Sequence, residues 1–469
     1  MPRNRAALLL GGVLLLAGCA TAPRYERPAV TTAAAYKELG PWQLAGSNVP
    51  TPGKWWELFG DPTLNGLEER VEAGNPGLAA AAARYEQARA LVRGAKADRF
   101  PQVDVGGDAG RSRVSAGRPL SPGNAATYND FEVGASLSYE LDLFGRVRNS
   151  VRAREADAQA SQADMAAVRL GLQAQLAATY FDLRGLDARI VLLRETVAAF
   201  QRAFELTDTR HSGGIASGLD VSRAQSQLAS AKAELDAVVA QRARDEHAIA
   251  TLIGESPSSF TLAVADAQPA PPAIPAGLPS TLLERRPDIA AAERRVAAAN
   301  AEIGVARAAL FPSVTLGAAG GFEATGGNLL SASNSFWALG PLSAALAIFD
   351  GGKRRANVRL TRAQYDEAAA NYRETVLTAF REVEDDLATA RQLQSQERNQ
   401  RDAVAAAERT RELALTRYRD GASDYLEVVT AQTAALDAER ALLQLRTEQL
   451  RVAVDTVRAL GGGPAAPRP

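Results

Sequence analysis

An internal duplication constrains this chain more strongly than any other feature of its sequence. A segment that starts at residue 75 and another that starts at residue 286 both run to a Phe-Pro pair, and these pairs, Phe100-Pro101 and Phe311-Pro312, are 211 residues apart. Further along, RHSGGIASGLDVSRAQ from Arg210 matches RYRDGASDYLEVVTAQ from Arg417 at an offset of 207. The chain therefore carries one structural plan twice, and the offset changes between the two matches, where we expect loop lengths to differ.

Each copy predicts the same order of elements: a helix that ends at Phe-Pro, two extended segments, a very long helix, a glycine-marked turn and a final long helix. We assign the first copy to residues 62–256 and the second to residues 280–461. The joining segment, residues 257–279, contains PAPPAIPAGLP, and this density of proline excludes a helix. Residues 19–61 and the tail, residues 462–469, are irregular, and we expect them to pack around the linker.

The predicted helices carry apolar side chains at seven-residue intervals. In the last helix the positions that keep this step are Val429, Leu436, Leu443, Leu450 and Val457. A sustained seven-residue period makes helices coil around their neighbours with a left-handed twist. The stretch from Arg146 to His211 would extend roughly 100 Å as a helix, at about 1.5 Å per residue. These helices alone would also suit a cytoplasmic type of coiled coil.

The extended segments alternate apolar and polar residues, which is the period of a β-strand with one apolar face. From Phe131 to Leu143 every odd-numbered residue is apolar, and this run of 13 residues is long enough to cross a membrane when tilted. The segment before it, from Gln102 to Arg111, alternates in the same way. In the second copy we assign to one apolar face the residues Val314, Leu316, Ala318 and Phe322, and then Phe336, Ala338, Leu342, Ala344, Leu346 and Ile348.

The predicted strands are too few to close a barrel within one chain, and open strand edges are not tolerated in lipid. Closure takes about eight strands or more, so a barrel would have to be shared between identical subunits. A dimer would supply about eight strands and a trimer about twelve, and only the larger ring leaves obvious room for an aqueous lumen. The alternative is two soluble hairpins on a helical body. The sequence thus predicts a mainly α fold with a smaller β part.

The N-terminus resembles a secretory leader, with Arg3 and Arg5 before an apolar run from Ala6 to Leu16. A bilayer of about 30 Å needs about twenty helical residues, so this run predicts a removable signal peptide, residues 1–18, and not a transmembrane helix. The end of the run, LAGC, resembles the bacterial lipobox, in which the cysteine is lipidated and becomes the mature N-terminus. The resemblance implies a diacylglyceryl thioether and an N-acyl chain on Cys19, and several acyl chains give firm anchoring. The next residue is alanine and not the aspartate that commonly retains lipoproteins at the inner membrane, which favours the outer membrane.

Composition excludes several classes of function. Cys19 is the only cysteine, which rules out an internal disulfide framework and a multi-cysteine zinc site, and His211 and His247 are the only histidines. A net charge of −1, from 53 basic and 54 acidic side chains, provides no general attraction to nucleic acid. No Walker-type phosphate loop is present, and we predict no enzymatic activity, no metal site and no cofactor besides the lipid on Cys19. We interpret the acidic residues between Glu382 and Asp386 as a solvated helix face.

Several motifs together resemble the outer-membrane efflux lipoproteins of the OprM and NodT type, in the wider TolC family. The resemblance covers nearly all of the mature chain, and no single motif would be specific. The residues that carry it are the lipobox at Cys19, Trp55-Trp56 with Leu58-Phe59-Gly60-Asp61-Pro62, the two Phe-Pro pairs, Glu140-Leu141-Asp142-Leu143-Phe144-Gly145, Arg285-Arg286-Pro287-Asp288 and Phe349-Asp350-Gly351-Gly352.

The resemblance implies a homotrimer in the outer membrane, with twelve strands in one shared β-barrel and the long helices in a periplasmic α-barrel. Residues 19–61, the proline-rich linker and the tail would form an equatorial belt. The implied partners are a periplasmic adaptor and an inner-membrane pump, commonly of the resistance-nodulation-division type. The chain would passively conduct drugs or other small molecules to the exterior. Two alternatives stay open: an exit channel for type I protein secretion, and a non-conducting coiled-coil envelope lipoprotein.

The resemblance also implies a gate at the two glycine-marked turns, which the long helices place far from the strands. Asp220 resembles the gate aspartate of the first copy, and Tyr418 resembles its tyrosine partner in the second. An ionised carboxylate that accepts from a tyrosine hydroxyl makes a workable latch. Glu427 falls where a constricting carboxylate is found, and Asp420 and Asp424 add acidic charge nearby.

One departure concerns Ser423, where some members of the family carry an arginine and others an aspartate. Neither type of ion pair can be transferred onto a serine. The alternative for Asp420, Asp424 and Glu427 is that they are ordinary solvated turn residues. In a trimer each carboxylate would occur three times around the axis, and such a ring would favour cations.

Overall fold

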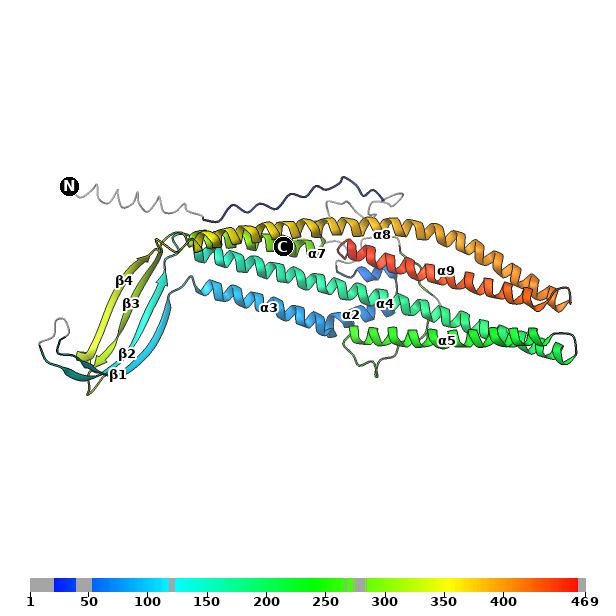
Figure 1. Ribbon diagram of the computed structural model, residues 1–469, viewed down its shortest axis with the longest axis horizontal. Helices are drawn as coiled ribbons and strands as arrows, with labels where there is room; N and C mark the ends of the chain where they lie inside the picture. The colour runs from blue at the N-terminus through cyan, green and yellow to red at the C-terminus, as the bar shows by residue number, and fades with distance from the viewer. Residues whose placement is uncertain are drawn as a thin grey trace. The chain divides into compact units, whose positions relative to one another are not determined.

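The computed structural model describes residues 21–38, 53–117, 123–265, 268–272, 274, 283 and 285–462. It is mostly helical with one small sheet, which confirms the predicted fold class (Figure 1). The chain forms two compact units. Unit 1 comprises Met1–Ala29, Arg84–Gln162 and Ala291–Arg373, and unit 2 comprises Val30–Ala83, Ala163–Ala290 and Glu374–Pro469. Among the described residues, no helix combines the length and the apolar character of a transmembrane helix.

The helices and strands follow one another in the same order in both copies. The first copy contains a 3-10 turn at Trp55–Phe59, α2 (Pro62–Gly74), α3 (Pro76–Ala97), β1 (Gln102–Val114), β2 (Ala126–Glu140), α4 (Arg146–Ser212) and α5 (Gly218–Leu252). The second contains α7 (Pro287–Ala308), β3 (Ser313–Ala324), a short 3-10 turn at Ala332–Asn334, β4 (Ser335–Ala345), α8 (Lys353–Arg419) and α9 (Tyr425–Ala459).

The equivalent helices of the two copies have equal lengths. Helices α4 and α8 each have 67 residues, α5 and α9 each have 35, and α3 and α7 each have 22. The α3 and α7 helices start 211 residues apart, and the four longer helices keep an offset of 207. The four residues of difference lie between the start of β1 and the start of α4, which is the hairpin segment. Loop length in the hairpin therefore accounts for the change in offset.

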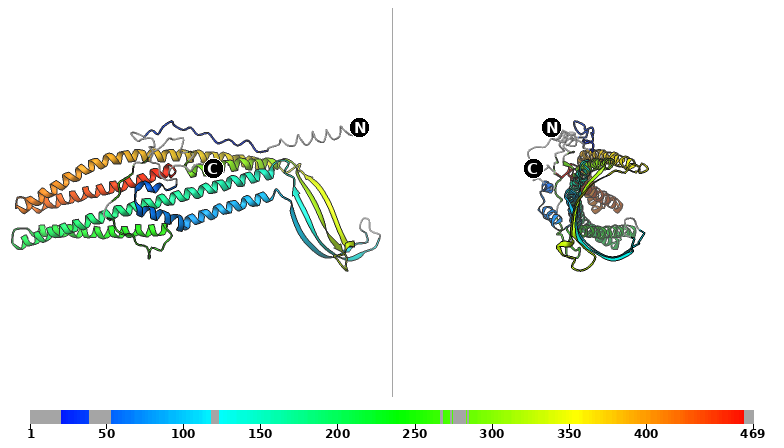
Figure 2. Two further views of the ribbon diagram at one scale, coloured as in Figure 1. Left: turned by 180° about the vertical axis from the view of Figure 1, so that it is seen from behind. Right: turned by 90° about the vertical axis from the view of Figure 1, so that its left-hand side faces the viewer.

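The strands of unit 1 form one antiparallel sheet in the order β1-β2-β3-β4, which curves as a single layer (Figure 2). Residues that pair across antiparallel strands lie on the same face of a sheet. Two successive rows on one face are apolar: Val103, Leu137, Ala318 and Leu339, and then Val105, Ala135, Gly320 and Trp337. A row on the other face joins three carboxylates, Asp108, Glu132 and Glu323. The alternation predicted for β2 is thus confirmed.

The prediction for the apolar face of β4 was wrong at Phe336 and Ala338. Leu316 of β3 pairs with Leu342, whereas Ala318 pairs with Leu339, so two steps along β3 correspond to three steps along β4. This extra residue is a β-bulge, and it moves the side chains on either side of it to opposite faces. As a result Phe336 and Ala338 share a face with the polar residues, and Leu342 lies on the apolar face.

The acidic residues from Glu382 onward are not simply solvated, which corrects our interpretation. Glu382 pairs with the buried guanidinium of Arg286 at 2.6 Å. The Glu384 carboxylate accepts from the backbone N–H groups of Lys37 and Glu38, at 2.8 and 3.0 Å. One oxygen of Asp386 is buried without a partner, and burial raises the pKa of this carboxyl to about 7. This helix face therefore holds the N-terminal segment and the start of the second copy.

The linker after α5 is held by a buried ionic cluster in unit 2. Asp187, which is fully buried, accepts from Arg242 Nε at 2.6 Å, from an Arg184 amino group at 2.9 Å and from the backbone N–H of Ala265 at 3.1 Å. The two arginines also donate to the carbonyls of Ala263 and Leu262, each at 2.7 Å. An irregular segment is thus fixed to two helices through its backbone polar groups.

Candidate functional site

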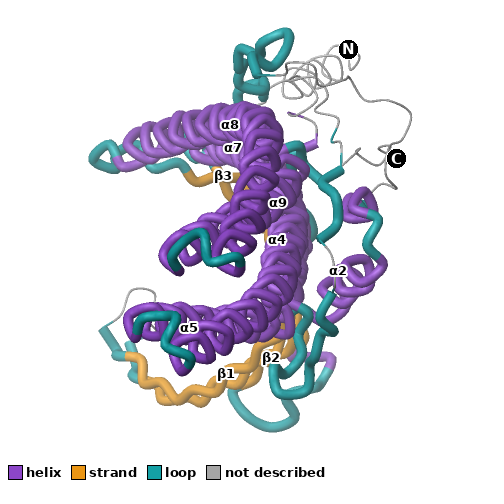
Figure 3. The backbone as a smooth tube through the Cα atoms, turned by 90° about the vertical axis from the view of Figure 1, so that its right-hand side faces the viewer, coloured by secondary structure: helices purple, strands orange, loops and turns teal. Residues whose placement is uncertain are grey.

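The two helical hairpins of unit 2, α4–α5 and α8–α9, end in turns of the same backbone geometry (Figure 3). Gly214 and Gly421 both have φ of +75°, a left-handed conformation that glycine adopts without strain. In the first turn Ile215 donates its N–H to the carbonyl of Arg210 at 2.8 Å, and in the second Ala422 donates to the carbonyl of Arg417, also at 2.8 Å. Both glycines that mark the turns in the sequence therefore end a long helix.

Asp220 and Asp424 both act as helix caps in this structure. Ser217 and Asp220 form a reciprocal capping box at the start of α5, with the Ser217 hydroxyl 2.7 Å from Asp220 Oδ2. Asp424 caps α9 by accepting from the backbone N–H of Glu427 at 3.1 Å. Each aspartate therefore has a local structural role, whether or not it also belongs to a gate.

Tyr418 is buried in a cluster that joins the two hairpins. Its ring lies 5.4 Å from the ring of Tyr425 at an interplanar angle of 61°, and both rings belong to a buried cluster with Ala224 and Val428. The Tyr418 hydroxyl lies 3.5 Å from the Thr207 hydroxyl oxygen, at the outer limit of a hydrogen bond. The α8–α9 turn is thus anchored against α4 and α5 by aromatic packing.

The structure does not join Asp220 to Tyr418 within the described part of the chain. Besides Ser217, the partner of Asp220 is Arg223, with its NH1 atom 3.7 Å from Oδ1. The Asp220 carboxylate instead influences Tyr425. Burial raises the pKa of the Tyr425 phenol to about 12, and the negative charges of Tyr418 and Asp220 add to this increase. The latch between Asp220 and Tyr418 stays a prediction.

The remaining predicted residues lie on the second turn. The carboxylate of Glu427 pairs with Arg417 Nε at 3.5 Å. Asp420 is exposed, and its backbone N–H donates to the carbonyl of Thr416 at 3.0 Å. The hydroxyl oxygen of Ser423 is buried without a partner in the described structure. The turn therefore combines an ion pair and an unsatisfied hydroxyl with carboxylates that are all exposed.

Arg210 contacts the second turn, and our sequence reasoning did not identify it as a candidate site residue. From the last turn of α4 it donates to the carbonyl of Tyr418 at 2.8 Å and to that of Arg419 at 3.2 Å. Its guanidinium carbon also lies 4.6 Å from the centroid of the Tyr418 ring. The available signal was the repeat itself, because an arginine recurs at the equivalent position, Arg417.

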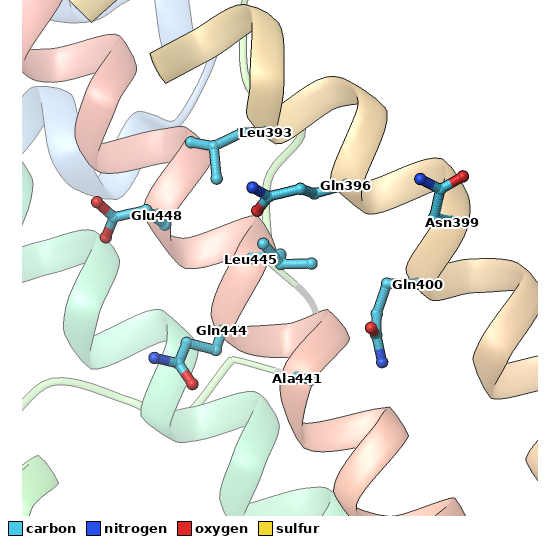
Figure 4. A pocket seen from close by; sticks show the side chains of 8 residues that line it. All are labelled: Leu393, Gln396, Asn399, Gln400, Ala441, Gln444, Leu445 and Glu448. Carbon is cyan, nitrogen blue, oxygen red and sulfur yellow. The ribbon is translucent and has the colours of Figure 1, made fainter. Parts of the chain in front are cut away.

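A polar groove lies between α8 and α9 in unit 2, away from the two turns (Figure 4). It has a volume of about 640 Å³ and is lined by Leu393, Gln396, Asn399, Gln400, Ala441, Gln444, Leu445 and Glu448. The amide of Gln400 donates to the carbonyl of Ala438 at 2.9 Å. Glu448 is the one titratable group in the lining, so this groove has no acid–base pair. Across the residues that the structure describes, no group of three or more His, Cys, Asp or Glu side chains could hold a metal ion.

Comparison with known proteins decides the family. A family model described as outer membrane efflux protein matches residues 67–255 and 278–462. The chain belongs to the outer membrane efflux protein family. It is 35% identical to the outer membrane protein OprJ of Pseudomonas aeruginosa, and the match covers 98% of this chain and 95% of OprJ. The family model and this relative place the protein in the outer membrane.

Solved structures of this family have the same fold. The outer-membrane channel OprN superposes with a TM-score of 0.88 and 34% identity, covering 94% of this chain and 99% of OprN. The open state of the MtrE outer membrane channel of Neisseria gonorrhoeae superposes with a TM-score of 0.82 and 29% identity, covering 95% of this chain and 98% of MtrE. These neighbours are channels, which agrees with the predicted function class. The predicted lipid attachment site, Cys19, lies outside the described residues.

Proposed function

We propose that three copies of this efflux protein assemble into one exit channel with a shared twelve-stranded barrel. The observation that carries this proposal is the sheet of unit 1, in which β1 and β4 are both edge strands. An open edge leaves a row of unpaired backbone N–H and C=O groups, which lipid cannot hydrate. Pairing β4 of one copy with β1 of the next would satisfy both edges, and three copies give a ring wide enough for an aqueous lumen.

The two faces of the sheet support this arrangement. The rows that contain Trp337 and Leu339, which are 84% and 78% exposed, would face lipid. The row of Asp108, Glu132 and Glu323 would then line the lumen. A lumen with this row in every copy would favour cations over anions.

The names of the relatives support a proposal for the partners. A relative in Pseudomonas putida that is 34% identical is named as a probable efflux pump outer membrane protein. We propose that this chain receives drugs or other small molecules from a periplasmic adaptor and an inner-membrane pump of the resistance-nodulation-division type. The channel would be passive and without enzymatic activity, since the pump would supply the energy. One alternative function is an exit channel for type I protein secretion. The other is a non-conducting envelope lipoprotein.

Lipidation of Cys19 would attach the chain to the membrane near the strands. Thr21, two residues further on, lies in unit 1, where its hydroxyl donates to the carbonyl of Phe144 at 2.9 Å. Phe144 follows the end of β2 and stacks on Phe311, which precedes β3, with ring centroids 4.7 Å apart. Acyl chains on Cys19 would therefore start close to the end of the sheet. No other cofactor is proposed.

The gate would lie at the turns of the two hairpins. Asp220, Tyr418, Asp420, Asp424 and Glu427 all lie at or beside these turns, and the Tyr418–Tyr425 cluster joins them. In a trimer the carboxylates would be repeated around the axis and could narrow and charge the entrance. Contacts of Asp220 with a tyrosine would then be made or broken as the hairpins move.

The experiment is a measurement of mass and of current on the same preparation. The purified, detergent-solubilised protein should have the mass of a trimer, and it should give single-channel currents in planar bilayers with higher permeability to cations than to anions. A trimer that gives no current would support the alternative hypothesis of a non-conducting envelope lipoprotein. A lone subunit in mild detergent would refute the shared barrel.

A further inference from the structure

The side chain of Arg210 connects the two hairpins of unit 2 at the level of the turns. Helix α8 ends at Arg419, and the last four carbonyls of a helix have no partner within it. Two of these carbonyls, those of Tyr418 and Arg419, accept from Arg210 at 2.8 and 3.2 Å. The end of α8 is therefore capped by a residue of the other copy.

Three favourable interactions coincide at this one guanidinium. A cation at the C-terminus of a helix is stabilised by the negative end of the helix dipole. The planar fork of arginine can donate to two carbonyls at once, which a lysine cannot do in the same geometry. The guanidinium also lies over the Tyr418 ring, 4.6 Å from its centroid, where the ring's quadrupole attracts a cation.

The equivalent arginine of the second copy does not make this connection. Arg417 lies 207 residues after Arg210, at the same point of the repeat. Its guanidinium contacts its own hairpin, the carbonyl of Ala422 at 3.5 Å and the Glu427 carboxylate at 3.5 Å. The connection is thus made in one direction only, from α4 to the end of α8.

An ion pair of Glu234 with Arg440 joins α5 to α9 farther from the turns, but the other contacts described between the hairpins near the turns are uncharged. They are the Tyr418 cluster, the approach of the Thr207 and Tyr418 hydroxyls, and a hydrogen bond from the Gln227 amide to the Thr433 hydroxyl at 3.2 Å. Hydrogen bonds with a charged partner contribute about 1.5–3 kcal/mol, roughly twice the neutral kind. Arg210 is therefore the strongest polar link described between the turns.

We propose that Arg210 is a positioning residue that holds the α8–α9 turn against the end of α4, and that opening of the gate requires its release. This inference rests on the proposed channel function for its consequence, but not for its structural part. In this proposal the turns are held together by hydrogen bonds from the Arg210 guanidinium to backbone carbonyls. In the predicted latch they are held together by the hydroxyl of Tyr418. The two ideas are separated by different single substitutions.

The test uses three variants of the full-length protein. Arg210→Gln removes the charge and the second donor, Arg210→Lys keeps the charge without the fork, and Tyr418→Phe keeps the ring without the hydroxyl. The control, Arg202→Gln, makes the same change at an exposed position on the same helix. Hydrogen exchange of peptides that cover residues 415–425 is the first measurement, because it needs no current through the channel.

We expect Arg210→Gln to speed exchange in these peptides by about tenfold, a factor that corresponds to 1.4 kcal/mol. Arg210→Lys should be intermediate, Tyr418→Phe should speed exchange less than Arg210→Gln, and Arg202→Gln should stay within about twofold of the wild type. In planar bilayers the open probability should follow the same order. Exchange in Arg210→Gln that equals the control would overturn the inference even if the protein conducts. A wild type without current would instead count against the channel, and the exchange result would still decide the role of Arg210.

Discussion

Replacement of Asp187 by alanine should be among the most destabilising single substitutions in unit 2. This carboxylate is fully buried and accepts three hydrogen bonds, two of them from arginines. The side chains of Arg184 and Arg242 are 6% and 11% exposed, so Asp187→Ala leaves two cations with little access to water. Breaking a buried ion pair by removal of one partner costs about 3–5 kcal/mol.

The structure also indicates where the damage should begin. Both arginines hold carbonyls of the linker at residues 262–263, and Asp187 itself holds the backbone of Ala265. Loss of the carboxylate should therefore release the linker from α4 and α5 before the helices unfold. Limited proteolysis should cut the variant first within residues 255–268, at protease concentrations that leave the wild type intact.

The matched control is Asp437→Ala, which removes a carboxylate from a pair with Arg440 at 3.2 Å. The Asp437 side chain is 62% exposed, and exposed pairs contribute at most about 1 kcal/mol. Denaturant unfolding followed by circular dichroism compares the two variants, and Asp187→Asn should recover part of the loss by keeping an acceptor oxygen. If Asp187→Ala and Asp437→Ala lose the same stability within about 1 kcal/mol, the cluster does not fix the linker.

Three further predictions concern the gate, the anchor and the α8 surface. Asp220→Ala should raise conductance, but it should also weaken the start of α5 by about 1 kcal/mol because the capping box is lost. Asp220→Asn tests the effect of the charge alone. Unchanged conductance in both of these variants and in Tyr418→Phe would reject the latch. Cys19→Ser should lose acylation, and radiolabelled palmitate on that variant would show that the anchor lies elsewhere. Since burial raises the folded-state pKa of Asp386 to about 7, its contribution to stability is complete below the ordinary carboxyl range and is lost as the pH rises toward 7. Asp386→Asn should therefore raise the melting temperature more at pH 8 than at pH 5, and an equal change at both would contradict the assigned burial.

The long helices could be predicted from sequence because their signals are local and occur twice. The glycines at 214 and 421 set where the helices end, and both copies share that spacing. The face of β4 could not be predicted in the same way. A bulge depends on which residue of β3 stands opposite, and the alternation within β4 alone carries no information on that pairing.

The placement of the candidate gate residues at the two turns could be predicted, but their contacts could not. Sequence reasoning placed Asp220, Tyr418 and Glu427 at the turns, where the structure has them. It missed that Ser217-Gly218-Leu219-Asp220 carries the spacing of a capping box, a signal that was present in the sequence. The partners of Tyr418 and Arg210 come from the other copy, about 210 residues away, and no local pattern specifies such contacts.

The duplication explains why the two turns share a backbone and differ in their side chains. A glycine in the left-handed conformation and equivalent backbone hydrogen bonds define each turn, and neither depends on the neighbouring side chains. The sequence around this frame was therefore free to diverge: position 217 is a serine in one copy and its equivalent, 424, is an aspartate, yet each caps its helix. The arginines at 210 and 417 kept their identity but contact different partners: Arg210 donates to the end of α8, and Arg417 contacts its own turn. Within the described part of the chain, one hairpin is thus held by the other without a reverse contact, as expected of repeats that follow one another head to tail.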